Sequence, residues 1–171
     1  MAVFLKRLLV CLALLAVQIL LLDRICLFHC VIPYIYFWFI LLLDSDISPY
    51  QRMLWGFFMG LAADIFLNTP GVQAAALTLT AYVQPFLLKL FVTYEHKDRI
   101  NPGAVTMSWG PYTLYLISSA LVFHTAVTLL SLSLIEPGIL LLRILVGTAL
   151  SVLMILLVEI LTRRKQRRRF R

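Results

Sequence analysis

The chain has 171 residues, of which 62% are hydrophobic and 13% are charged, and its mean hydropathy is +0.95. A soluble domain is closer to half apolar, so this composition excludes an ordinary soluble protein and predicts an all-α integral membrane protein. The net charge of +7 comes from basic residues near the C-terminus, directly after an apolar run. That position favours contact with anionic lipid and argues against nucleic-acid binding.

Six apolar runs follow one another along the chain and predict a bundle of about six transmembrane helices. The predicted spans are residues 1–22, 25–43, 53–67, 72–91, 112–135 and 139–161. Pro33 is expected to kink the second span. In a five-span alternative, the third and fourth helices merge, which would bury the polar turn Asn-Thr-Pro-Gly at residues 68–71 within the membrane. The predicted domains are a six-helix transmembrane domain, residues 1–162, and a basic tail, residues 163–171.

The distribution of Lys and Arg predicts that both termini face the cytoplasm. With six spans, every Lys and Arg except Arg24 and Arg143 falls on the side of the two termini, as the positive-inside rule requires. The tail residues expected to contact anionic lipid at the membrane surface are Arg163, Arg164, Lys165, Arg167, Arg168 and Arg169.

The third span carries a stripe of small residues and one carboxylate. Gly56, Gly60, Ala63 and Asp64 recur at spacings of three and four residues, so they lie near one face of a helix. Small residues on one face let another membrane helix approach closely. We therefore predict that Gly56, Gly60 and Ala63 form a helix-packing or partner interface, with Asp64 sheltered by protein beside it.

Asp64 and Arg143 both lie about one helical turn inside the same predicted outer boundary. Ionisable groups within a span are costly and usually find partners. Their matched depth and opposite charge predict that they pair, or share a polar pocket near the outer face. The alternative is that each side chain reaches the outer interface separately.

Other polar residues in the spans are interpreted as structural. Gln18, Gln73 and Gln84 are expected to form hydrogen bonds between helices. His124 is interpreted as a neutral, hydrogen-bonded histidine, with a proton relay as the less favoured alternative.

No pattern of catalytic or cofactor-binding residues is present. The sequence lacks D-x-x-D, H-E-x-x-H, G-x-S-x-G and P-loop motifs, so we predict neither enzymatic activity nor a cofactor. Cys26, His29 and Cys30 lie close together, but the nearby sequence offers no fourth metal ligand. We interpret the two cysteines as small residues of a membrane helix.

The region from Gly56 to Tyr82 resembles the rod shape-determining protein family MreD. Gly56, Gly60, Leu61 and Asp64 match the family's G-x-x-x-G-L-x-x-D core. A turn containing glycine follows, and then a small-residue helix that ends near Tyr82. This chain departs from the family in its turn, which reads Thr-Pro-Gly-Val where the family often has a glycine-leucine pair.

The resemblance implies a non-enzymatic scaffold subunit of the bacterial cell-elongation (rod) complex, or elongasome, in the inner membrane. Such subunits are involved in cell shape and peptidoglycan synthesis. Their partners are the bitopic protein MreC, the actin-like MreB and a peptidoglycan polymerase–transpeptidase pair. The family's bundle is also loosely similar to substrate-binding components of energy-coupling-factor transporters. A small-molecule binding or transport subunit, with a pocket near Asp64 and Arg143, is therefore the alternative, and an enzyme acting on a lipid head group is disfavoured.

Overall fold

The computed structural model describes residues 2–22, 33–44, 47–91, 108–131 and 137–169, which form helices and connecting turns without any β-strand. The helices are α1 (Ala2–Val17), the π-helix η1 (Gln18–Leu22), α2 (Trp38–Leu41), α3 (Pro49–Leu67), α4 (Val72–Phe91), α5 (Trp109–Leu130) and α6 (Pro137–Arg169). Three described stretches are long and apolar enough to cross a membrane: Val72–Phe91, Trp109–Leu130 and Gly138–Leu161. They indicate a membrane protein, as the composition predicts.

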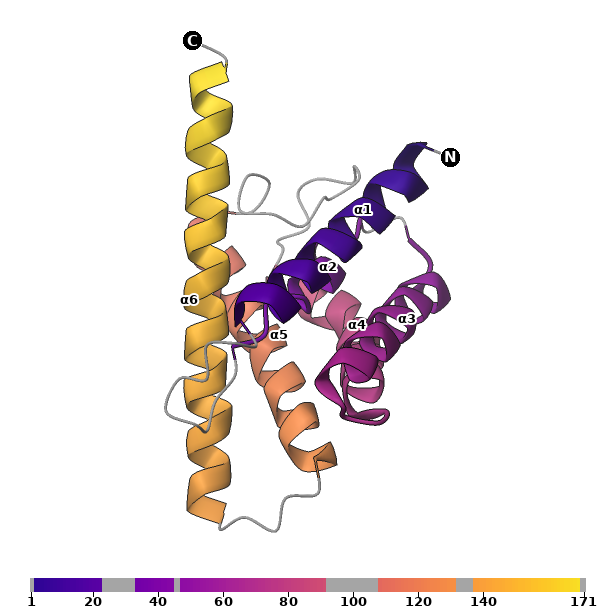
Figure 1. Ribbon diagram of the computed structural model, residues 1–171. Helices are drawn as coiled ribbons and strands as arrows, with labels where there is room; N and C mark the ends of the chain where they lie inside the picture. The colour runs from indigo at the N-terminus through magenta and orange to yellow at the C-terminus, as the bar shows by residue number, and fades with distance from the viewer. Residues whose placement is uncertain (1, 23–32, 45–46, 92–107, 132–136, 170–171) are drawn as a thin grey trace.

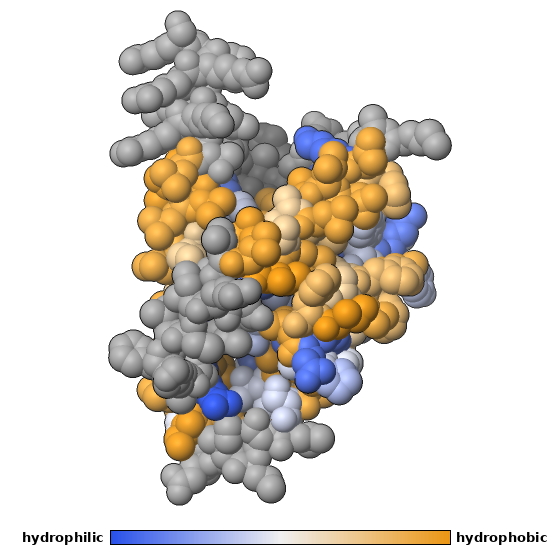
Figure 2. All heavy atoms as spheres, viewed as in Figure 1, coloured by the Kyte–Doolittle hydropathy of each residue, from blue (hydrophilic) through white to orange (hydrophobic). Residues whose placement is uncertain are grey.

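The helices α3 to α6 pack in chain order, each against the next, while α1 contacts α2 and α3 (Figure 1). The N-terminal end of α1 and the C-terminal end of α6 lie toward the same end of the molecule. The turn between α3 and α4 lies toward the opposite end, as does the end of α5. Much of the visible surface of α1, α3 and α6 is hydrophobic, which suits helices in contact with lipid (Figure 2).

A tight turn separates α3 from α4. The helix α3 ends at Leu67, and Asn68 follows in the left-handed region with φ 54°. Gly71, at φ 80°, completes the turn before α4 begins at Val72. The five-span alternative is therefore wrong in joining these helices. The predicted fourth span, residues 72–91, coincides with α4.

The predicted second helix, residues 25–43, is not formed in the half that the structure describes. Residues 33–35 are not helical, residues 36–37 form a turn, and α2 is a single helical turn. Residues 23–32, which include Cys26, His29 and Cys30, lie outside the described residues.

Side chains from distant helices take the place of helical hydrogen bonds in this segment. The amide of Gln18 donates to the carbonyl oxygen of Pro33 at 3.1 Å, and its Oε1 accepts from the backbone N–H of Ile35 at 2.9 Å. The N–H of Tyr34 donates to Ser151 Oγ of α6 at 3.0 Å. Non-helical backbone at membrane depth is tolerated where protein covers it. Residues 33–37 thus depart from the helix that hydropathy predicts, and side chains of η1 and α6 bind their backbone.

The same segment supplies the aromatic centre of the core. The rings of Phe37 and Phe123 are stacked, with their centroids 5.2 Å apart. The largest fully buried side chains include Tyr36, Phe37, Phe39, Tyr112, Tyr115 and Phe123. The aromatic residues from 36 to 39 therefore pack inside the helical bundle.

Candidate docking site on the α3–α4 hairpin

Asp64 lies near the end of α3 and caps the start of α4. It is buried, and its carboxylate accepts three hydrogen bonds. Oδ1 accepts from Thr69 Oγ1 at 2.8 Å and from the backbone N–H of Gln73 at 2.9 Å. Oδ2 accepts from the backbone N–H of Ala74 at 2.9 Å. The first amides of a helix have no partner within it and form the positive end of its dipole. The carboxylate of Asp64 therefore joins the two helices across the turn.

The stripe of small residues on α3 packs against α4 of the same chain. A Cβ atom added to Gly56 would lie 2.9 Å from the carbonyl oxygen of Leu77. At Gly60, it would lie 2.6 Å from the amide nitrogen of Ala74. Ala63 is also buried. The predicted helix packing is thus internal, and the stripe does not receive a partner's helix because α4 already occupies it.

The predicted ion pair between Asp64 and Arg143 is not formed. Donors of the hairpin occupy both carboxylate oxygens of Asp64. Arg143 is half-buried on α6, and its Nε has no hydrogen-bond partner in the described part of the chain. Equal depth in the membrane does not make two helices neighbours: α3 packs against α4, whereas α6 packs against α5.

The glutamines singled out in the sequence each bond to another part of the fold. Gln73 Oε1 accepts from the hydroxyl of Tyr36 at 2.5 Å, which ties the core segment to the start of α4. The amide of Gln84 donates to the hydroxyl of Tyr115 at 2.7 Å, which joins α4 to α5. With Gln18, they connect elements that are distant in sequence.

His124 of α5 is buried and hydrogen-bonded, as the sequence predicts. Its Nε2 lies 3.0 Å from Ser151 Oγ on α6. Its ring packs on Gly147, where an added Cβ would lie 2.6 Å from Nδ1. Since Ser151 also accepts from the N–H of Tyr34, this interaction links α5, α6 and the non-helical segment.

Sequence reasoning missed a charged cluster where α1, α2 and α3 meet. A guanidinium nitrogen of Arg7 lies 2.6 Å from Asp44 Oδ2. The buried guanidinium of Arg52 donates to the carbonyl oxygens of Asp44 at 3.0 Å and Ile47 at 3.4 Å. Arg7 and Asp44 have opposite charges near one predicted boundary, so the depth criterion applied to Asp64 and Arg143 would have found this pair.

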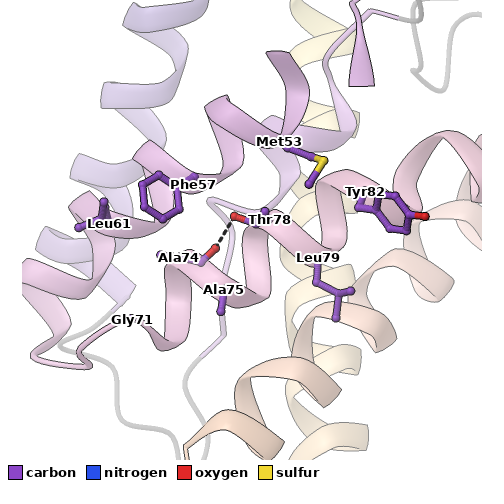
Figure 3. A pocket seen from close by; sticks show the side chains of 9 residues that line it. All are labelled: Met53, Phe57, Leu61, Gly71, Ala74, Ala75, Thr78, Leu79 and Tyr82. Carbon is purple, nitrogen blue, oxygen red and sulfur yellow. Dashed lines mark hydrogen bonds between the residues drawn. The ribbon is translucent and has the colours of Figure 1, made fainter. Parts of the chain in front are cut away.

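The outer surface of the hairpin carries an apolar groove of about 560 Å³ between α3 and α4 (Figure 3). Bulky side chains of α3 form one wall, and α4 lines the other side with small residues and with Leu79 and Tyr82. The lining residues are Met53, Phe57, Leu61, Gly71, Ala74, Ala75, Thr78, Leu79 and Tyr82. Small residues beside large ones provide the kind of surface on which membrane helices pack closely.

The C-terminal part of α6 continues as a helix through Arg169, so the backbone does not break at the predicted domain boundary. The side chains of residues 162–169, which include the predicted lipid-binding tail, lie outside the described part. Among the described residues, no group of three or more His, Cys, Asp or Glu side chains is placed to hold a metal ion.

Comparison with known protein families, curated proteins and solved structures finds no match for this chain. The functional interpretation of the hairpin therefore depends on its geometry and on its sequence pattern.

Proposed function

We propose that this protein is an MreD-like, non-enzymatic scaffold subunit of the bacterial cell-elongation complex, and that a partner's transmembrane helix docks in the α3–α4 groove. The partner is an MreC-like bitopic membrane protein. Through it the subunit takes part in regulating cell shape and peptidoglycan synthesis, together with MreB and the polymerase–transpeptidase pair. The proposed location is the bacterial inner membrane, with several spans and both termini in the cytoplasm.

The α3–α4 hairpin supports this proposal because the MreD-like residues have a common structural role in it. Gly56 and Gly60 allow the backbones of the two helices to approach. Asp64 caps α4 and connects it to the turn. A rigid hairpin presents its outer surface in one defined shape, which lowers the ordering cost of binding a partner helix.

The groove is the observation that carries the proposal. It runs from Gly71, in the turn, along α4 to Tyr82, a rise of about 16 Å. That is about half of the hydrocarbon thickness of a bilayer, or about three turns of a docked helix. Ala75 and Thr78 let a helix approach closely, while Phe57 and Leu61 offer apolar side chains for packing.

The arrangement of the chain ends supports the proposed topology. The start of α1 and the end of α6 lie toward one end of the molecule (Figure 1), which an even number of spans requires. The basic residues from Arg163 to Arg169 would then lie on the cytoplasmic side, where anionic lipids attract them.

The transport alternative receives no comparable support. It requires a polar pocket near Asp64 and Arg143, but the hairpin occupies both oxygens of Asp64. The groove is lined almost wholly by apolar surface, which suits a helix better than a polar small molecule.

Co-purification tests the proposal. The full chain, co-expressed with an MreC-like partner and extracted in mild detergent, is expected to retain that partner at fixed stoichiometry. Ala75→Phe fills the groove at an exposed position and should lower partner recovery about tenfold, as an overpacking cost near 1.4 kcal/mol implies.

Ala149→Phe is the matched control, since Ala149 is exposed on α6, outside the groove. It should leave recovery unchanged. Equal recovery of the partner with Ala75→Phe would overturn the docking surface. Loss of the partner from the wild-type chain would overturn the scaffold function itself.

A further inference from the structure

A second pocket, of about 360 Å³, lies between α1 and the end of the segment that contains α2. Its polar edge consists of Lys6, Arg7 and Asp44. The rest of its lining is apolar: Val10, Phe39, Leu42 and Leu43. A pocket of this size with a charged edge and an apolar wall fits part of a ligand that has both characters.

Basic side chains outnumber acidic ones among the described residues around this pocket. Asp44 is paired with Arg7 at 2.6 Å. Arg52, behind Asp44, uses its guanidinium on backbone carbonyl oxygens and pairs with no carboxylate in the described part of the chain. Lys6 is exposed and likewise forms no ion pair with a described residue. The described charges around the pocket therefore favour an anion.

The pocket opens at the edge of an apolar surface. Phe4, Leu5 and Leu9, close to Lys6 on α1, are 59–61% exposed. The apolar run of α1 continues beyond them, and Asp44 ends the neighbouring apolar segment. Lys6 and Arg7 thus lie where hydrocarbon gives way to polar surroundings, the level at which phospholipid headgroups are found.

We propose that this pocket binds one anionic phospholipid, with its phosphate at Lys6 and Arg7 and its acyl chain along the apolar wall. Arg7 can keep its bond to Asp44, because a guanidinium has five N–H donors. Lys6 supplies a charge that no described carboxylate satisfies. The acyl chain would cover Val10 and the exposed apolar side chains of α1. This site is separate from the α3–α4 groove, with which it shares no lining residue.

Native mass spectrometry of the purified full chain tests the proposal. The probes are phosphatidylglycerol and phosphatidylcholine with identical acyl chains, and inorganic phosphate as a competitor. The wild-type chain should bind at least one phosphatidylglycerol in preference to phosphatidylcholine. Lys6→Gln should weaken that binding about fivefold, the effect of about one basic residue near anionic lipid.

Two further variants keep the test specific. Lys89→Gln removes an equal charge from the exposed end of α4 and should leave the site intact. Val10→Trp keeps every charge but fills the pocket, and it should also abolish the bound phosphatidylglycerol.

Several results would overturn the proposal. One is equal binding of the two lipids, and another is unchanged binding by the Lys6→Gln chain. A third is displacement of phosphatidylglycerol by millimolar inorganic phosphate, which would indicate a site for a free anion. None of these outcomes bears on co-purification of the MreC-like partner, so this inference and the scaffold function fail separately.

Discussion

The α3–α4 hairpin and the segment from Pro33 to Asp44 are stabilised in different ways. In the hairpin, residues close in sequence meet across a short turn, and backbone approach at Gly60 is supported by the cap at Asp64. The other segment is held by side chains from far along the chain, such as Gln18 and Ser151. The structure of the hairpin follows from the spacing of residues that are close in sequence. The structure of the segment from Pro33 to Asp44 forms only when distant helices have packed.

The largest expected effect comes from breaking the hairpin at Gly60. Gly60→Ala places a Cβ against backbone atoms of α4, which cannot move away as a flexible side chain would. We expect a loss of about 3 kcal/mol in the free energy of unfolding, the upper range for overpacking. Reversible unfolding in mixed micelles would measure it.

Gly110→Ala is the control for this substitution. Gly110 is exposed on α5, and nothing lies within 4 Å of an added Cβ. Its stability should not fall, because Ala is also the better helix former. Equal stability of the two variants would show that the helices are not in close contact at Gly60.

A smaller loss is expected when the cap is removed. Asp64→Ala leaves the backbone N–H groups of Gln73 and Ala74 without their acceptor. We expect the free energy of unfolding to fall by about 2 kcal/mol, as for the loss of a strong helix cap. The same unfolding measurement applies.

A double-mutant cycle sharpens this result. Asp64→Asn and Arg143→Gln should be additive to within about 0.5 kcal/mol, because the two side chains share no partner. A coupling energy well above that value would show that Asp64 and Arg143 do form the ion pair that their matched depth predicts from the sequence.

The smallest loss of stability is expected when the segment from Pro33 to Asp44 loses a hydrogen-bonding side chain from a distant helix. Gln18→Met keeps the length of the side chain but removes both bonds to the backbone at Pro33 and Ile35. We expect a loss of about 1 kcal/mol, typical of polar contacts between membrane helices. Hydrogen exchange at the Ile35 amide should accelerate while exchange at Ala74 stays unchanged.

Gln84→Met serves as the comparison, since it breaks the bond to Tyr115 without touching the segment. Hydrogen exchange at the Ile35 amide should be as slow in this variant as in the wild-type chain. If both variants accelerate exchange at Ile35 equally, the segment is not held by Gln18 in particular.

Hydropathy and turn chemistry were enough to predict most helices. The fourth predicted span coincides with α4, and the turn at residues 68–71 lies where Pro and Gly indicate it. The prediction failed at residues 33–37, because apolar composition does not distinguish a lipid-facing helix from a buried, non-helical segment. Pro33 marks this segment in the sequence, but the side chains that bind its backbone lie far along the chain. Gln18 of η1 bonds to Pro33 and Ile35, and Ser151 of α6 accepts from the N–H of Tyr34.

Within the candidate site, the residue pattern identified Gly56, Gly60 and Asp64 as a unit but not what they contact. Helical spacing is a local property, so it places these residues near one face of α3 whatever surrounds them. Which helix lies beside α3 depends on how all the helices pack. Because α4 lies there, Asp64 accepts hydrogen bonds from backbone N–H groups of α4 and does not pair with Arg143. Apolar runs and helical faces follow from the order of residues along the chain, whereas partners across space follow from packing, because a hydrogen bond or ion pair forms only between groups a few ångströms apart.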